Sequence, residues 1–290
     1  MKSIRPIGTT TQLCAVIGNP VAHSLSPAIH NAAFGKMDLD FVYVAFHVVD
    51  LGSALKGMRA LNNFRGMSIT IPHKVDAMRH VDEISDVDRS IGSINTVINS
   101  GGVLKGYGTD GPGALRALHD AHVDLNGRHV LMLGSGGAAR AVSFTLARNA
   151  GISCLTILDI NDPMRLALAD DLRAGTSSPI ESEPLNEGFL ADAMARSDIV
   201  INSTPIGMHP NHDSSIIPLE LFRPGQVVFD IVYNPLETRL LKEARSRGLL
   251  AISGVEMFIN QAALQFELFT GMPAPVEVMR GVVMEKLTGG

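Results

Sequence analysis

Residues 130–150 constrain the fold of this chain more than any other segment. An apolar run at 130–133 leads into a glycine turn, and a helical pattern follows as far as Ala150. The turn consists of Gly134, Ser135, Gly136, Gly137, Ala138 and Ala139. Strand, glycine turn and helix in this order are the context that a dinucleotide fingerprint requires, because the glycines let a pyrophosphate approach the helix N-terminus. The segment predicts a Rossmann-type α/β domain.

A second apolar run, 154–158, ends at Asp159. In such folds an acidic residue about 20 positions beyond the glycines meets the adenosine ribose. A carboxylate suits ribose hydroxyls and repels a 2′-phosphate, and no basic residue follows before Arg165. We therefore expect NAD in preference to NADP. The alternative, that Asp159 caps the helix after Pro163, is weakened because Pro163 lies four positions further along the chain.

Length and composition indicate an ordinary globular protein with a small-molecule substrate. The 290 residues are 46% hydrophobic and 18% charged, enough for two domains. A net charge of −5 argues against nucleic-acid or anionic-membrane partners. No apolar run approaches the roughly 20 residues that span a bilayer, and the N-terminus lacks a signal-peptide pattern. We expect a cytoplasmic monomer or homodimer.

The two cysteines, Cys14 and Cys154, lie in apolar strand-like runs. We expect both to be buried free thiols, because neither has a metal-ligand spacing to other residues. No metal ion is expected.

The chain before and after the glycine turn alternates between strands and helices. The patterns predict strands at 13–17, 41–46, 67–71 and 94–98, helices at 27–36 and 51–62, and a short helix after Pro72. They indicate a first α/β domain with a largely parallel sheet. Strands and helices alternate again from 129 to 252 around a polar stretch at 175–186, and helices at about 255–270 and 274–287 follow.

Two serines begin the first predicted helix. Ser26 followed by Pro27 is a strong helix start, with serine at the N-cap. Ser26 could therefore serve only as a cap. Alternatively, Ser24 and Ser26 together place two hydroxyls at a helix N-terminus, where a small carboxylate can bind.

Further polar residues follow other strand-like runs. Thr70 and Lys74 lie at the carboxyl end of a strand, the edge where α/β sheets bind ligands, although a lysine there is usually solvated. Asn95 and Asp110 lie among glycines and small residues, and Thr109 or Asp110 could simply cap the next helix. If Lys74 and Asp110 meet, the carboxylate can orient the ammonium group, which then acts as acid or base at a hydroxyl or ketone.

These segments, in this order, resemble the shikimate dehydrogenase family, including its quinate/shikimate branch. The matching segments are 18–27, 69–74, 94–96, 108–111, 134–140, 202–208, 230–233 and 257–263. The resemblance implies an enzyme that reversibly transfers hydride between a nicotinamide and a ring alcohol of shikimate, quinate or a close relative. It also implies a substrate-binding and catalytic domain of residues 1–111 and 256–290 around a NAD(P)-binding domain of residues 112–255.

The resemblance assigns a role to each matching residue. Lys74 and Asp110 correspond to the catalytic pair. The residues implied to bind substrate are Ser24, Ser26 and Tyr233 at the carboxylate, and Ser68, Thr70, Asn95 and Gln261 around the ring hydroxyls. Those implied to line the cofactor cleft are the 134–140 turn, Asp159, Thr204 and Met257.

Two departures from the family pattern leave the substrate open. Ser68 stands where the family usually has an asparagine that contacts substrate hydroxyls, and Gly108 stands where it has an asparagine before the threonine. A missing hydrogen bond lowers discrimination between close analogues. The alternatives are a family member acting on a different hydroxy or amino carboxylate and a non-catalytic regulator that senses NAD.

Overall fold

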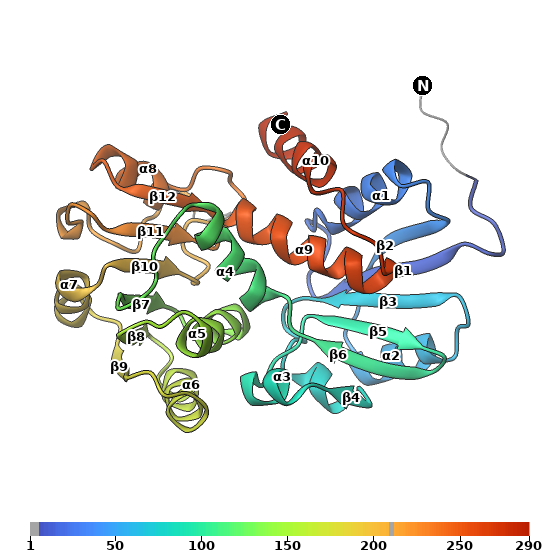
Figure 1. The fold of residues 1–290 in the computed structure, drawn as a ribbon, viewed down its shortest axis with the longest axis horizontal. Coiled ribbons are helices and arrows are strands. Elements are labelled where there is room, and N and C mark those ends of the chain that lie inside the picture. Colours follow the sequence, from blue (N-terminus) through green and yellow to red (C-terminus); the bar gives the residue numbers. More distant parts are fainter. Residues whose placement is uncertain (1–5, 209–211, 290) are drawn as a thin grey trace. The chain divides into compact units, whose positions relative to one another are not determined.

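The computed structural model describes residues 6–208 and 212–289. The chain divides into two compact units, Met1–Thr109 with Gln261–Gly290, and Asp110–Asn260 (Figure 1). The first segment of the first unit ends at Thr109, where Gly111 was expected, and its second segment begins at Gln261, where Glu256 was expected. None of the helices in the described part of the chain is both long and apolar enough to span a bilayer.

The first unit is built around one six-stranded sheet. Its elements are β1 (Gln12–Gly18), α1 (Ser26–Lys36), β2 (Phe41–His47), α2 (Leu51–Arg59), β3 (Phe64–Ile69), the 3₁₀ helix η1 (Asp76–Arg79), β4 (Glu83–Ile84), α3 (Asp86–Ile91), β5 (Thr96–Ser100), β6 (Val103–Tyr107), the last part of α9 (Gly254–Thr270), and α10 (Val276–Thr288). The strand order is β2-β1-β3-β5-β6-β4. The helix expected over 51–62 ends at Arg59, and the short helix after Pro72 is η1.

The sheet of the first unit is largely parallel as expected, since five of its six strands run in one direction and β5 runs against them. β1 is parallel to β2 and β3, whereas β5 is antiparallel to both β3 and β6. The reason is a two-residue hairpin turn at Gly101 and Gly102, which both adopt positive φ and return β5 directly into β6. No apolar pattern predicts β6, because Lys105 and Gly106 interrupt it.

Side chains from helices cover both faces of this sheet. On one face Leu51 and Leu55 of α2 belong to the same core as Ile17 of β1. On the other face Phe34 of α1 lies with its ring centroid 5.5 Å from that of Phe266 in α9.

The second unit contains an entirely parallel six-stranded sheet, which confirms the predicted Rossmann-type domain. Its elements are α4 (Asp110–Asp120), β7 (His129–Leu133), α5 (Gly137–Asn149), β8 (Cys154–Asp159), α6 (Asp162–Gly175), β9 (Ile180–Pro184), α7 (Glu187–Arg196), β10 (Ile199–Asn202), the 3₁₀ helix η2 (Leu219–Leu221), β11 (Val227–Asp230), α8 (Arg239–Ser246), β12 (Leu250–Ser253) and the first part of α9. The strand order is β12-β11-β10-β7-β8-β9, with parallel pairing throughout.

The order of these strands reverses between β7 and β10. The chain proceeds from β7 outward through β8 to β9, then returns to β10 on the other side of β7. In open parallel sheets such a switch point opens a crevice at the carboxyl ends of the strands. The glycine turn follows β7, and Thr204 follows β10, so both lie at this crevice.

Two expectations fail at the outer edge of this sheet. The polar stretch 175–186 contains β9, whose Glu181 and Pro184 are typical of an edge strand rather than a buried one. Both cysteines are free, but Cys154 is only partly buried, because it begins β8 next to this edge; Cys14 is buried as expected.

Candidate active site

In the first unit the segment 70–74 is held against the carboxyl end of β1. The amide of Thr70 donates to the carbonyl of Ile17 at 3.0 Å, and the amide of Asn19 donates to the carbonyl of Ile71 at 2.9 Å. Gly18 allows this contact, because a Cβ there would lie 2.4 Å from Cγ2 of Thr70. The segment therefore leaves β3 at the predicted ligand edge.

Lys74 is positioned through its backbone and its neighbour. Its carbonyl accepts from the amide of Ile94 at 3.0 Å. The buried ring of His73 places Nε2 2.8 Å from the carbonyl of Val48, so His73 has a structural role. The Lys74 side chain is partly exposed, and the two contacts hold the backbone of residues 73 and 74 in place.

A buried polar cluster lies beside this segment. Asn95 Nδ2 donates to Thr109 Oγ1 at 2.9 Å, and the amide of Thr109 donates back to Asn95 Oδ1 at 2.8 Å. Thr109 Oγ1 also donates to Gln261 Oε1 at 3.5 Å. Since all three residues are almost fully buried, their amide and hydroxyl groups are held in fixed orientations.

Ser68 belongs to a second buried network. Tyr43 Oη donates to Ser68 Oγ at 2.6 Å, and Ser68 Oγ donates to Gln265 Oε1 at 2.7 Å. Gln265 Nε2 in turn donates to Thr96 Oγ1 at 3.1 Å. Burial raises the pKa of Tyr43. The Ser68 hydroxyl is thus oriented by two partners that the sequence analysis missed.

The serines near α1 are arranged differently from the expectation. Leu25 is the N-cap residue, and Ser26 is already the first helical residue, so the prediction of a serine N-cap is wrong. Instead Ser24 Oγ accepts from the amide of Ser26 at 3.3 Å. Ser26 is buried and its hydroxyl hydrogen-bonds that of Tyr43.

In the second unit the glycine turn has the geometry that the fingerprint requires. Gly134 adopts φ +104°, and a Cβ there would lie 3.1 Å from the backbone of Ser203. Gly136 is the N-cap of α5 and has no side chain to bond the first amide groups of the helix. Ala139 is fully buried, whereas Gly137 and Ala138 are partly exposed. An anion can therefore approach these amides directly.

Asp159 is fixed beside this turn. Ser135 Oγ donates to Asp159 Oδ2 at 2.6 Å, and the amide of Asn161 donates to Oδ1 at 2.9 Å. Asn161 is the N-cap of α6 and accepts from the amide of Met164 at 3.1 Å. Asp159 is therefore not the helix cap, and its carboxylate is held at the end of β8.

A third network orders the end of β10. Asn202 Oδ1 accepts from Thr204 Oγ1 at 2.7 Å, and Asn202 Nδ2 donates to Asp230 Oδ1 at 2.9 Å. Thr238 Oγ1 donates to Asp230 Oδ2 at 2.6 Å. Burial nevertheless raises the pKa of Asp230 to about 6. Thr204 is thereby held next to Gly134.

The remaining predicted site residues of the second unit lie on three different segments. Asp110 is buried and begins α4, where the helix N-terminus favours a carboxylate. Tyr233 stacks on Phe258 with ring centroids 4.5 Å apart, and burial raises its pKa. Met257 is buried in α9. The pairing of Asp110 with Lys74 stays a prediction, because the two residues belong to different units.

The sequence did not predict Tyr43 and Gln265 as site residues, nor Thr109 as the hydrogen-bond partner of Asn95. Two signals could have found them. Tyr43 places a hydroxyl in the middle of an apolar strand, and Gln265 lies four residues after Gln261, on the same side of α9.

The chain is similar to known shikimate dehydrogenases over almost its whole length. Residues 16–97 match the shikimate dehydrogenase substrate binding domain, and residues 254–284 match the shikimate 5'-dehydrogenase C-terminal domain. The chain is 43% identical over 284 residues to shikimate dehydrogenase (NADP(+)) of Moorella thermoacetica, covering 97% of this chain and 95% of that protein.

Solved structures agree with this result. Shikimate 5-dehydrogenase from Listeria monocytogenes, in complex with shikimate and NAD, superposes with a TM-score of 0.90 at 33% identity, covering 98% of this chain and 100% of the other. Quinate dehydrogenase from Corynebacterium glutamicum, in complex with NAD, superposes with a TM-score of 0.87 at 30% identity, covering 95% and 99%.

Proposed function

This chain belongs to the shikimate dehydrogenase family, and on that premise we propose that it reversibly interconverts 3-dehydroshikimate and shikimate, 3-dehydroquinate and quinate, or both. The observation that carries the proposal is similarity over 97% of the chain, which includes the segments of both units that supply the candidate site. The first unit binds the hydroxycarboxylate and the second binds the dinucleotide. NAD or NADP is the cofactor.

The first unit recognises the substrate through neutral hydrogen-bonding groups. Ser24 and Ser26 hold the carboxylate near the start of α1, with Tyr233 of the second unit completing this contact. Ring hydroxyls are bound by the substrate-binding residues Ser68, Thr70, Asn95 and Gln261. The fixed orientation of Asn95 and Ser68 supports this assignment, because preorganised groups lose little entropy when a polyol binds.

Lys74 and Asp110 carry the proton transfer. When bound, the nicotinamide supplies hydride to the substrate ketone or accepts it from the alcohol carbon. Lys74 donates a proton to the developing alkoxide in reduction and removes it in oxidation. Asp110 orients the Lys74 ammonium group toward that oxygen and stabilises its charged form. The remaining residues hold the ring in line, which contributes the proximity effect.

The second unit fits a dinucleotide at the switch point. The amide groups after Gly136 receive the pyrophosphate, Asp159 binds the adenosine ribose, and Thr204 and Met257 line the nicotinamide side. We favour NAD over NADP, because the Asp159 carboxylate is already oriented by Ser135 and would repel a 2′-phosphate.

Steady-state kinetics with shikimate and quinate, each with NAD and NADP, tests the proposed function. We expect nicotinamide reduction with at least one acid and a higher kcat/KM with NAD. If neither acid is oxidised with either cofactor, the proposed reaction is wrong. If both acids react only with NADP, the reaction stands but the cofactor assignment to Asp159 fails.

The variant Asp159→Ser tests the cofactor assignment separately. Loss of hydrogen bonds between a carboxylate and the ribose should lower kcat/KM for NAD relative to NADP by about 10- to 100-fold. Asp162→Asn is the matched control, because Asp162 lies three residues away at the exposed start of α6 and pairs with Arg165. An equal change in both variants would remove Asp159 from ribose recognition.

A further inference from the structure

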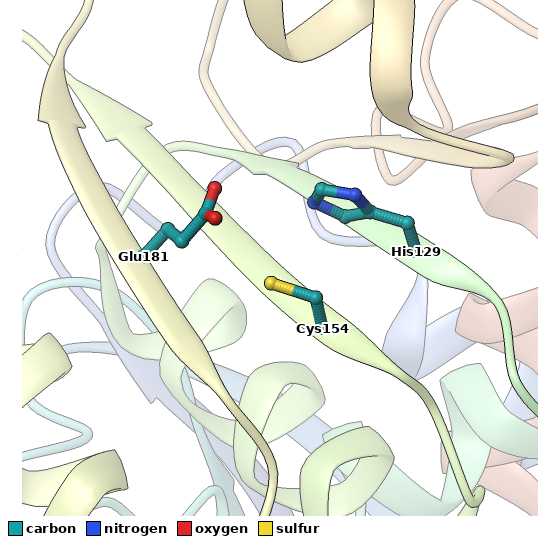
Figure 2. Close-up of side chains that lie close together, drawn as sticks. All are labelled: His129, Cys154 and Glu181. Carbon is teal, nitrogen blue, oxygen red and sulfur yellow. The ribbon is translucent and has the colours of Figure 1, made fainter.

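A cluster of three potential metal ligands lies on the sheet of the second unit, away from the candidate active site. Among the residues that the structure describes, His129, Cys154 and Glu181 place one nitrogen, one sulfur and one oxygen within 4.8 Å of one another. Figure 2 shows the three side chains on adjacent strands, with the imidazole, thiol and carboxylate facing a common space. All three are partly exposed, so an ion from solvent can reach them.

Parallel strand pairing puts these residues on one face. His129 of β7 is directly opposite Cys154 of β8, and Glu181 of β9 is directly opposite Thr156, two residues beyond Cys154. Since side chains alternate along a strand, residues 154 and 156 point to the same face. The cluster therefore rests on three hydrogen-bonded strands rather than on loops, and its geometry is fixed by the sheet.

Thr156 holds the imidazole and the carboxylate in place. Its hydroxyl donates to Glu181 Oε2 at 2.9 Å, and His129 Nε2 lies 2.8 Å from Thr156 Oγ1. A neutral imidazole has one ring nitrogen with a lone pair that a cation can use.

We propose that His129, Cys154 and Glu181 bind a thiophilic divalent cation such as Zn²⁺, with water as the fourth ligand. Sulfur, imidazole nitrogen and carboxylate oxygen are the donors that Zn²⁺ takes in tetrahedral sites. Binding releases the Cys154 thiol proton to solvent. Coordination through His129 Nε2 moves the proton of that nitrogen to Nδ1, and a coordinate bond replaces the hydrogen bond to Thr156. Thr156 continues to donate to Glu181 and orients that ligand.

The position of this metal site indicates a structural role rather than a catalytic one. His129 and Cys154 begin β7 and β8, whereas Gly134 and Asp159 lie at the opposite ends of these strands. Five or six residues of strand separate the two edges, which corresponds to roughly 16 Å. A bound ion would therefore cross-link β7, β8 and the edge strand β9 without touching the reacting atoms.

Arg196 controls the affinity of this site. Its guanidinium lies 2.9 Å from Glu181 Oε2 and 3.1 Å from Asp192 Oδ2. The positive charge of Arg196 competes with a cation for Glu181. Removal of this charge should therefore strengthen metal binding, a direction that a purely structural polar cluster does not produce.

Titration of the metal-free full-length protein with Zn²⁺, followed by calorimetry and thermal unfolding, tests the proposal. Co²⁺ is a second probe, because coordination by a thiolate produces a ligand-to-metal charge-transfer band. We expect one ion per chain, a melting temperature that rises with Zn²⁺ concentration, and the Co²⁺–thiolate band. Turnover at saturating substrate should not change.

Four variants separate this site from adventitious binding. Cys154→Ala should abolish the Co²⁺ band and weaken Zn²⁺ binding by more than the 10- to 100-fold typical of a lost outer-shell partner, and His129→Gln should weaken it similarly. Cys14→Ala removes the other thiol of the chain and should leave both signals unchanged. Arg196→Gln should bind Zn²⁺ several-fold more tightly.

The proposal is overturned if wild-type protein binds no ion, or if Cys154→Ala and Cys14→Ala bind Zn²⁺ equally well. Equal affinity of Arg196→Gln and wild type would remove Glu181 from the ligand set. Because the readouts are binding and unfolding, failure of the proposed dehydrogenase activity would leave these results unaffected.

Discussion

The two units present polar groups at their sheet edges by different means. In the first unit, the residues proposed to bind substrate come from distant parts of the chain. Their side chains hydrogen-bond to one another, as those of Asn95, Thr109 and Gln261 do. In the second unit, the glycine turn depends on backbone geometry at Gly134 and Gly136, and Asp159, which Ser135 orients, follows in the next strand. In the proposed function, substrate recognition therefore rests on tertiary packing, whereas recognition of the pyrophosphate rests on a local turn.

This difference predicts different consequences of substitution. A change in the first unit disturbs several partners of a buried network at once, so stability and substrate binding should change together. A change at the glycine turn can alter ligand binding with little effect on the fold, provided that the added atoms meet open space.

The largest expected effect is that of Lys74→Met. Loss of the proton donor should reduce kcat by about 10²- to 10⁴-fold, because general acid–base catalysis contributes this much. Shikimate binding, measured by calorimetry, should remain within about tenfold of wild type, since Lys74 is one of several polar contacts. The exposed Lys56→Met is the matched control and should keep full activity. Unchanged turnover in Lys74→Met would exclude Lys74 from proton transfer.

The glycine turn gives the next largest effect. A Cβ at Gly136 meets no atom within 4 Å, and φ there is −68°, so Gly136→Ala should fold normally. The added methyl would nevertheless occupy the path of the pyrophosphate, and we expect NAD affinity to fall by about 10- to 100-fold.

Gly134→Ala provides the contrast within the same turn. Gly134 has a positive φ, and an added Cβ would lie 3.1 Å from the backbone of Ser203. The variant should therefore lose about 1–3 kcal/mol of unfolding free energy and should also bind the cofactor more weakly. Urea unfolding and fluorescence titration with NADH measure the two quantities. If Gly136→Ala bound NADH as wild type does, the pyrophosphate would not lie at this turn.

The same contrast explains what could be predicted from sequence. The glycine turn and Asp159 are part of one strand–turn–helix pattern, so their spacing alone predicts the geometry that the structure has. The network of Tyr43, Ser68 and Gln265 joins positions 25 and 197 residues apart, and no local pattern reports such contacts.

Two polar strands are missing from the predicted elements for a related reason. β6 and β9 carry polar side chains, so they lack the apolar runs that identify buried strands. The His129, Cys154 and Glu181 cluster is likewise invisible in the sequence, because its ligands come from three strands and have no short spacing. The resemblance to a known family compensates for this only where a motif exists.

Ser68 tests whether the first unit behaves as one network. Ser68→Ala would leave the Tyr43 hydroxyl and the Gln265 carbonyl oxygen without their partner in a buried site, which should cost about 1–3 kcal/mol of unfolding free energy. Tyr43→Phe removes one of these groups, so the double variant should lose about 1 kcal/mol less than the sum of the two single variants. Additive losses would show that the two hydroxyls act independently.

The smallest expected effect concerns two buried titratable groups with opposite pH dependence. In the first unit, burial lowers the pKa of His30 to about 3, so its contribution to stability is present above pH 6.5 and lost as pH falls. In the second unit, burial raises the pKa of Asp230 to about 6. The Asp230 contribution is therefore fully present below its unfolded pKa of 3.8 and is lost as pH rises through 6.

Because these contributions oppose each other, only a comparison of variants isolates Asp230. Asp230→Asn can keep the contacts with Asn202, Val232 and Thr238 while it removes the titration. Relative to this variant, wild type should lose about 1 kcal/mol of unfolding free energy between pH 5 and pH 7. Urea unfolding of both proteins at the two pH values measures this difference. A difference that does not change with pH would mean that Asp230 is ionised throughout, and that its three hydrogen-bond donors offset the cost of burial.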